Sequence, residues 1–213
     1  MIVVIQCASS KRADAGFLST RDGKPTLFVA DPELAPQTSN LAYARPDDVA
    51  DNGQNWRDAL LRYNEAPGSN PLRLLPAYQL YTRDTYRRLV ERFGIDSIYI
   101  LSAGWGLIKA SFLTPAYDIT FSVAAEPYKR RKKGERYRDL QMLPPDCQDE
   151  IVFLGGKDYL PLFCTLTDGL RCPKTVFYNS GSPPAAPGCV LKRFFTTTRT
   201  NWHYECADRL IAN

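Results

Sequence analysis

The chain has a single histidine, His203, and none of its six cysteines lies in a C-x-x-C pair. Zinc sites of ordinary spacing need closely spaced cysteines and histidines, so we expect no metal and no other cofactor. No apolar run approaches the roughly 20 residues that span a bilayer, and the N-terminus lacks the basic and long apolar segments of a signal peptide. We therefore expect a cytoplasmic protein with reduced thiols and no membrane contact.

Two common nucleotide-binding motifs are also absent. Gly155-Gly156-Lys157 does not have the G-x-x-x-x-G-K-[ST] spacing of a phosphate-binding P-loop, and no G-x-G-x-x-G follows the first predicted strand. These absences argue against a nucleotide-dependent motor and against a dinucleotide oxidoreductase.

Four short apolar runs predict the strands of one α/β domain over residues 1–213. The runs are residues 2–7, 97–102, 150–155 and 174–179. Each is rich in β-branched and aromatic residues with little alternation, which is typical of a parallel sheet covered on both faces. Helical patterns occur at residues 82–94, 157–170 and 201–212. We expect a three-layer fold, with a mostly parallel central sheet of about four core strands flanked by helices.

Two segments fall outside this pattern. Residues 16–76 are rich in Pro, Asp, Asn and Gly, and predict an irregular insertion with one helical patch at residues 55–64. Residues 123–145 predict a basic loop region. Within it, the run KRRKKGERYR (129–138) carries seven basic residues and one acid, so its charge of +6 leaves −2 for the rest of a +4 chain. Such a cluster favours docking of a polyanion such as DNA, with a solvated loop as the alternative.

Small and polar residues follow each predicted strand. Ser9, Ser10 and Lys11 follow the first strand, and residues 102–106 end the second. Gly155-Gly156-Lys157 follows the third strand and Asn179-Ser180 the fourth. Because ligands bind beyond the carboxyl ends of the strands in open α/β sheets, these turns predict one polar cleft that accepts anions. Small polar turns are common after strands, so the prediction rests on the four together.

Asp118 is the candidate catalytic residue, because it is a single acid between Tyr117 and Ile119. A carboxylate in apolar company can activate water or stabilise a cationic sugar-like transition state; the alternative is a turn cap. The candidate base-binding residues are those that could stack on a base or read its edge. They are Ser102, Gly104, Trp105, Tyr117 and Asn179.

Hydroxyl and cationic side chains supply the candidate phosphate- and DNA-binding residues. They are Ser9, Ser10, Lys11, Lys109, Lys129, Arg130, Arg131, Lys132 and Lys133. Lys11 or Lys109 could also act as the nucleophile of a Schiff-base lyase, and nothing in the sequence favours that route over attack by water.

Three segments resemble the bacterial YaaA-like proteins and related small domains of unknown function found in phage and defence contexts. They are PAYQLYTRDTYRRL, ILSAGWGLIKASFLTPAYDITF and FLGGKDYLPLF, with matching elements at Leu101-Ser102-Ala103, Gly106-Leu107 and residues 115–118. The QCASSK opening resembles the Cys-x-x-Ser-Lys start of the small domains. The resemblance leaves out much of residues 16–70. It implies DNA binding and a core similar to that of uracil-DNA glycosylases and of base-exchange enzymes of deazaguanine metabolism. The Gly-Gln-Asp-Pro-Tyr and His-Pro-Ser motifs of those glycosylases are absent, so Asp118 would have to supply the chemistry.

These observations predict an enzyme that flips a modified or damaged DNA base into the cleft and cleaves its N-glycosidic bond. Two alternatives stay open. One is a non-catalytic DNA-binding protein of stress response or antiviral defence. The other is an enzyme acting on free nucleosides or nucleotides, for which the basic run would be irrelevant.

Overall fold

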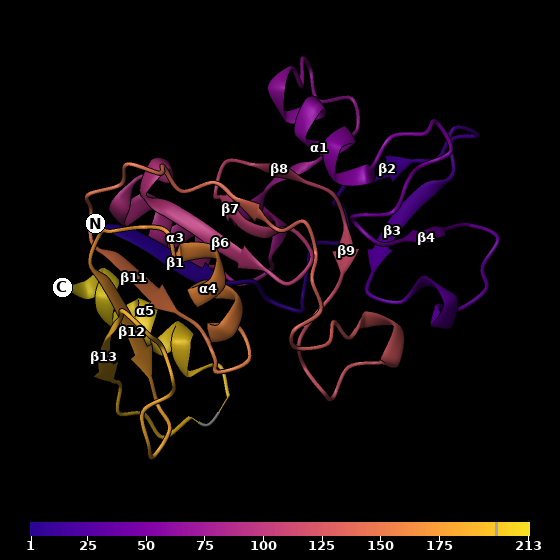
Figure 1. Cartoon of the computed structure of the whole chain (residues 1–213). Coiled ribbons are helices and arrows are strands. Elements are labelled where there is room, and N and C mark those ends of the chain that lie inside the picture. Colours follow the sequence, from indigo (N-terminus) through magenta and orange to yellow (C-terminus); the bar gives the residue numbers. More distant parts are fainter. Residues whose placement is uncertain (199) are drawn as a thin grey trace.

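The four predicted strands form the middle of the main sheet. The computed structural model describes residues 1–198 and 200–213, and its main sheet has seven strands in the order β10-β7-β6-β1-β11-β12-β13 (Figure 1). The predicted strands are β1 (Ile2–Gln6), β6 (Ile98–Ser102), β11 (Ile151–Leu154) and β12 (Lys174–Tyr178). They are almost wholly buried, as their unbroken apolar sequences predict.

The expected number of strands, about four, is too low. The edges carry three more strands: β7 (Gly106–Lys109), β10 (Leu140–Gln141) and β13 (Val190–Arg193). β10 has only two residues and β13 is mostly exposed, so neither has the apolar run that marks a buried strand. The sheet is mostly parallel, as predicted: β1 pairs in parallel with β6 and β11, while β6 and β7 form an antiparallel hairpin.

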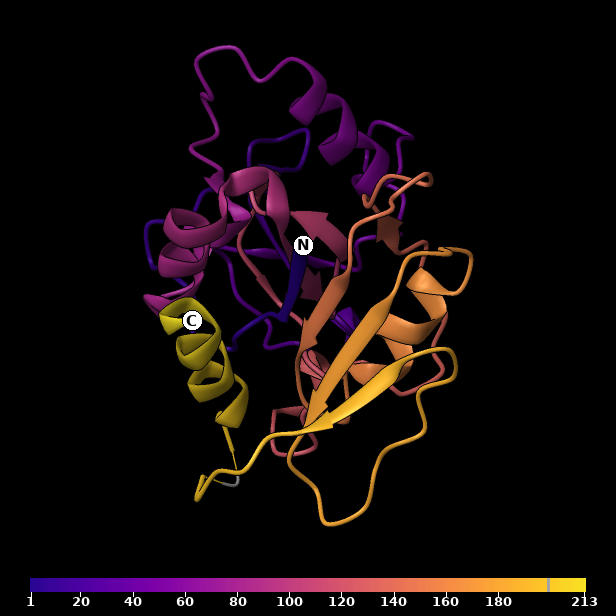
Figure 2. The same cartoon turned by 90° about the vertical axis from the view of Figure 1, so that its left-hand side faces the viewer.

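Helices cover both faces of the main sheet, which confirms the layered arrangement. Figure 2 shows α3 (Thr85–Phe93) and α5 (Trp202–Ala212) on one side of the sheet and α4 (Leu160–Thr167) on the other. All three lie within the predicted helical patterns. α3 buries Tyr86 and Leu89 against the sheet and ends at Gly94, whose φ of +83° is a conformation that glycine adopts without strain.

Residues 16–76 are more ordered than an irregular insertion. They contain β2 (Leu18–Ser19), β3 (Pro25–Val29), β4 (Ala42–Ala44), α1 (Trp56–Glu65) and β5 (Leu75–Pro76). β3 pairs with β2, β4 and β9 (Tyr117–Asp118) in a second sheet, to one side of the main sheet (Figure 1). β2, β4 and β9 have only two or three residues, which is too few to give a sequence signal, whereas β3 has five, as many as β1, and was not predicted from the sequence. α2 (Ala77–Leu80) follows, and β5 pairs with β8 (Leu113–Thr114).

Within the described residues, no helix combines the length and apolar character needed to cross a membrane.

Two buried arginines hold the turn that joins β6 to β7. Arg57 of α1 donates to the carbonyl oxygens of Gly104 and Trp105, each at 3.0 Å, and its Nε lies 2.6 Å from an Asp47 carboxylate oxygen. Arg131 donates to the carbonyl of Ala103 at 2.8 Å. Three consecutive carbonyls, which are buried with the turn, are thereby satisfied by side chains from distant segments.

The close packing of this turn also explains its glycines. Gly106 has a φ of +88°, and a Cβ atom there would lie 2.5 Å from the carbonyl oxygen of Leu140. The Ser102 hydroxyl accepts hydrogen bonds from the backbone N–H groups of Gly104 and Trp105. The sequence SAGWG is therefore required by the fold before any ligand is considered.

We expect Arg57→Met to lower the free energy of unfolding by about 3–5 kcal/mol, because it leaves the Asp47 carboxylate and two buried carbonyls without their partner. Urea denaturation measures the loss. Arg62→Met, on the exposed side of the same helix, should change it by no more than about 0.5 kcal/mol. Similar small effects of the two substitutions would contradict this role for Arg57.

Candidate functional site

The chain reverses direction across the sheet between β1 and β11. From β1 it continues through α3 to β6 on one side of β1, and from β11 it continues through α4 to β12 on the other side. Adjacent strands whose connections run over opposite faces leave a crevice at their carboxyl ends, and ligands of open α/β sheets bind there. The two strand ends are tied together by Gln6, whose Oε1 accepts a hydrogen bond of 2.6 Å from the N–H of Gly156.

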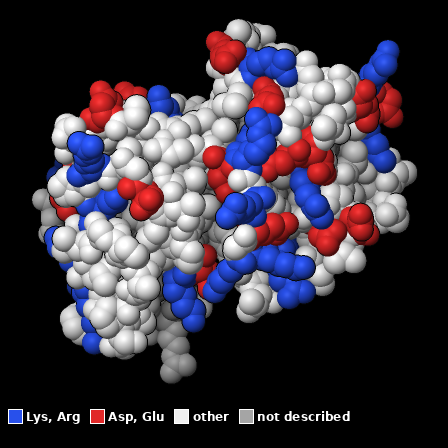
Figure 3. All heavy atoms as spheres, in the orientation of Figure 1, with Lys and Arg blue, Asp and Glu red and all other residues white. Residues whose placement is uncertain are grey.

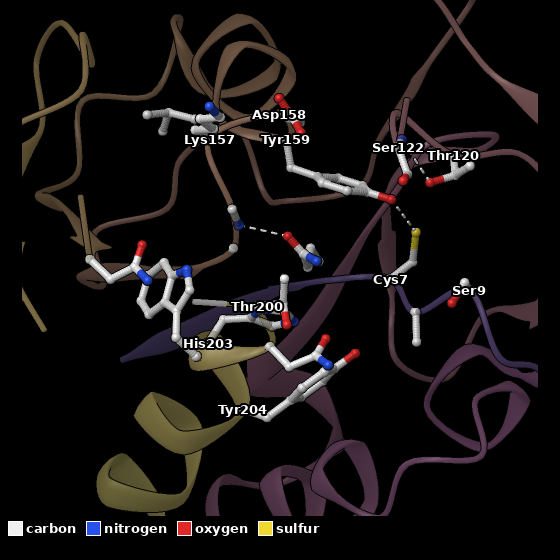
Figure 4. A pocket seen from close by; sticks show the side chains of 18 of the residues that line it. Cys7, Ser9, Thr120, Ser122, Lys157, Asp158, Tyr159, Thr200, His203 and Tyr204 are labelled. Carbon is white, nitrogen blue, oxygen red and sulfur yellow. Dashed lines mark hydrogen bonds between the residues drawn. The ribbon is translucent and has the colours of Figure 1, made fainter. Parts of the chain in front are cut away.

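A cleft of about 950 Å³ opens at this crevice. Its walls come from the turns after β1, β11 and β12, from the segment after β9, and from the start of α5. Figure 4 shows Cys7 and Ser9 on one side, Lys157 and Asp158 on another, and His203 with Tyr204 below them. The volume is at the upper end of the range for small-molecule sites.

Positive charge predominates in the cleft lining. Among the described residues, the charged side chains that line it are Arg83, Lys157 and Asp158. Asp158 pairs with Lys133 at 2.5 Å, whereas the described residues offer Arg83 and Lys157 no ion pair. Ser9, Ser10, Asn179 and Ser180 add neutral hydrogen-bonding groups. Such a lining favours an anionic ligand over a cationic or apolar one.

A group of protonated tyrosines lies around Cys7, and two of them, Tyr159 and Tyr204, line the cleft. The thiol of Cys7 lies 3.2 Å from the hydroxyl of Tyr159, and Tyr86 donates to the backbone oxygen of Gln6 and meets the hydroxyl of Tyr204. Burial raises the pKa of Tyr159 and of Tyr86 well above the ordinary value for tyrosine. These phenols therefore stay neutral and act as hydrogen-bond donors.

His203 is a buried, uncharged histidine at the start of α5. It is 3% exposed, its ring centroid lies 4.0 Å from that of Tyr204, and its Nε2 has no partner among the described residues. Burial, with a smaller contribution from the Arg83 charge, lowers the pKa of His203 to about 4. The imidazole is therefore neutral at physiological pH.

Four of the five candidate base-binding residues lie in the core instead of the cleft. Ser102, Gly104, Trp105 and Tyr117 are all buried, and the Trp105 ring packs edge-on against Phe28 with centroids 5.0 Å apart. Trp105 has no exposed surface on which a base could stack in this structure. Only Asn179 of this set lines the cleft, together with the predicted phosphate-binding residues Ser9 and Ser10.

Asp118 lies outside the cleft lining, in an ion pair. Its carboxylate is 2.7 Å from the ammonium of Lys129, which also contacts Glu126 at 3.1 Å. Burial opposes the charge on Lys129, but the hydrogen bonds to Asp118 and Glu126 outweigh it and raise the pKa of Lys129. The ion pair joins the end of β9 to the start of the basic run, and the catalytic role of Asp118 stays a prediction.

Neither Lys11 nor Lys109 belongs to the described lining of the cleft. The ammonium of Lys11 lies over the ring of Tyr117, 4.2 Å from its centroid, and burial lowers the pKa of Lys11. Lys109 pairs with Tyr99 in the antiparallel hairpin, so it lies where β6 begins, whereas the cleft is at the edge where β6 ends. A shared phosphate site that includes Lys109 is incompatible with this register.

Most of the basic run 129–138 is engaged with acids of the same chain. Arg131 is 4% exposed and binds both carboxylate oxygens of Asp139, at 2.8 and 2.6 Å. Ion pairs also join Lys129 to Asp118, Lys133 to Asp158 and Arg138 to Asp58. Figure 3 shows positive and negative side chains interleaved over the middle of one face. Arg130, Lys132 and Arg136 are the exposed members for which the described residues provide no ion pair.

Comparison of the chain with protein-family models, with curated proteins and with solved structures gave no match. The resemblance to YaaA-like proteins and to the core of uracil-DNA glycosylases therefore rests on the sequence motifs alone and stays a prediction. Within the described residues, no group of three or more His, Cys, Asp or Glu side chains is placed to hold a metal ion.

Several cleft residues carried no sequence signal. Arg83 precedes α3, and Trp202, His203 and Tyr204 begin α5, more than 190 residues after β1 along the chain. Nothing in their local sequence shows that α5 packs beside α3 and brings its first turn to the cleft. Lys157 and Cys7 could be found, because Cys7 ends the first predicted strand and Lys157 lies two residues after the third.

We expect the protein to lose stability as the pH falls from about 6.5 to about 4, because unfolded His203 binds a proton in this range and the folded form does not. The difference corresponds to about 3 kcal/mol at most. Urea denaturation at several pH values measures it. His203→Gln removes the titrating group, so its stability should fall less over the same range; an unchanged slope would contradict the buried neutral state.

Proposed function

We propose that the protein is an enzyme that acts on a free nucleotide bound in the cleft between β1 and β11. The observation that carries the proposal is the charge of the cleft lining, where Arg83 and Lys157 are unpaired among the described residues and Asp158 is the one acid, in an ion pair with Lys133. A phosphate group is an anion whose geometry the guanidinium fork matches, and hydroxyl groups can also donate to its oxygens. Phe177, Tyr178 and Trp202, also in the lining, offer aromatic surface to a base.

The same lining supports cleavage of the N-glycosidic bond. Loss of the base leaves positive charge on the sugar ring, which a nearby carboxylate stabilises while water adds to the anomeric carbon. The proton of that water passes to the departing base. Asp158 is the carboxylate that the described lining offers, and the protonated phenol of Tyr159 beside it can donate a hydrogen bond to the leaving base. Asp118 has no part in this scheme because it lies outside the cleft lining.

A base in DNA is the second candidate substrate. Arg130, Lys132 and Arg136 favour it, since they are exposed and make no ion pair with any described residue. We rank it second because Lys129, Arg131, Lys133 and Arg138 of the same run already bind carboxylates of this chain. A strand passing over the run would have to compete with those pairs.

The test is release of free base from a panel of ribo- and deoxyribonucleoside 5′-monophosphates, followed by liquid chromatography and mass spectrometry. We expect the wild type to release base and Asp158→Asn to be slower by about 100-fold or more. Asp96→Asn is the matched control, because Asp96 is exposed just before β6, at the opposite edge of the sheet.

Three outcomes would contradict the proposal. Loss of activity in Asp118→Asn but not in Asp158→Asn would return catalysis to the sequence-predicted residue. Release of base from DNA oligonucleotides alone would make DNA the substrate. Binding of nucleotides or DNA without release of any base would leave a binding protein.

A further inference from the structure

A second cavity, of about 550 Å³, lies next to the cleft. It is lined by three arginines, Arg12, Arg83 and Arg87, and by the polar side chains of Tyr78, Gln79 and Thr82. We call it the arginine pocket. It is formed where the segment after β1 meets the end of α2 and the start of α3.

Arg83 joins the two cavities. It lines both of them, and its guanidinium lies over the ring of Tyr204, 4.6 Å from the centroid. Tyr204 itself lines the cleft. An anionic group beside Arg83 would therefore lie at the residue that the cleft and the arginine pocket share.

Two of the three arginines, Arg83 and Arg87, keep charge that an anion can bind. No carboxylate belongs to its described lining. Arg87 contacts Asp84 only at 3.7 Å, and both side chains are more than 60% exposed, so their pairing is weak. Arg12 binds both oxygens of Asp14, which is also exposed. Three guanidinium groups around one cavity suit phosphate, which their planar fork can bind through two hydrogen bonds.

The pocket is also large enough for more than phosphate. Its volume falls within the range of complete small-molecule sites. Tyr78 offers a partly exposed ring, and the amide nitrogen of Gln79 donates to the Tyr78 hydroxyl at 2.7 Å, which leaves the amide oxygen of Gln79 free to accept from a base edge. A second nucleoside fits this chemistry.

We infer that the ligand is a dinucleotide, in which two nucleosides are joined through phosphates, with the phosphates beside Arg83 and one nucleoside in each cavity. The inference rests on the proposed function, which places the first nucleoside in the cleft. Recognition would rely on guanidinium side chains, which agrees with the absence of a glycine-rich phosphate-binding motif after β1.

Isothermal titration calorimetry with adenosine 5′-monophosphate and with diadenosine 5′,5′-pyrophosphate tests the inference. We expect the wild type to bind the dinucleotide at least about 10-fold more tightly than the mononucleotide. Arg87→Ala removes a charge-assisted contact to the second half only, so it should weaken dinucleotide binding by about 10-fold and leave mononucleotide binding unchanged. Arg62→Ala, an exposed arginine on α1 outside both cavities, is the matched control.

The outcomes separate the two proposals. Equal affinity for both ligands, a preference for the mononucleotide, or equal loss of both in Arg87→Ala would overturn the dinucleotide inference and leave the proposed function standing. Binding of neither ligand by the wild type would overturn both. A loss of dinucleotide binding in Arg62→Ala as large as that in Arg87→Ala would show a nonspecific charge effect and would also overturn the inference.

Discussion

The rest of the structure depends on how Arg57 and Arg131 satisfy the turn between β6 and β7. Buried carbonyls cost free energy unless they are hydrogen-bonded, and a buried guanidinium is tolerated only when paired. Here the buried guanidinium groups donate to the buried carbonyls, so both are hydrogen-bonded. Arg57 brings α1 and Asp47 to the carbonyls of Gly104 and Trp105, while Arg131 brings the 129–138 segment to the carbonyl of Ala103.

The contact of Arg131 with this turn also positions part of the cleft wall. Because Arg131 is fixed at the turn, the segments on either side of it lie over the carboxyl ends of the strands. On one side, residues 120–125 form part of the cleft wall, and on the other Lys133 reaches Asp158 before α4. The basic run therefore connects the second sheet to the cleft, because Lys129 pairs with Asp118 of β9 and Lys133 pairs with Asp158 of the cleft lining. Most of its positive side chains are paired with carboxylates of the same chain. The proposed ligand is therefore a small anion in the cleft and not a long polyanion on the surface.

The tyrosines and His203 complete the cleft in a different way. Burial keeps the Tyr159 phenol protonated and His203 neutral, so this part of the lining offers hydrogen bonds without fixed charge. The positive groups Arg83 and Lys157 are exposed and lie in the cleft lining. A ligand with a charged phosphate and a neutral base matches this separation, since its two parts require these two environments.

The sequence by itself determined the layered fold and the edge of the sheet where the cleft lies. Apolar runs such as residues 98–102 and 151–154 predict buried strands because a strand covered on both faces needs apolar residues at every position. Residues that follow the predicted strands β1 and β12, such as Ser9 and Asn179, had to lie near the cleft. Only the tertiary structure decided which of the other strand-end residues face the core. Trp105 turns inward because Arg57 and Phe28 pack on it, and Asp118 is occupied by Lys129. It also decided that Arg83 and His203 join the cleft. Packing and ion pairs of this kind form between residues far apart in the chain, so local sequence patterns do not predict them.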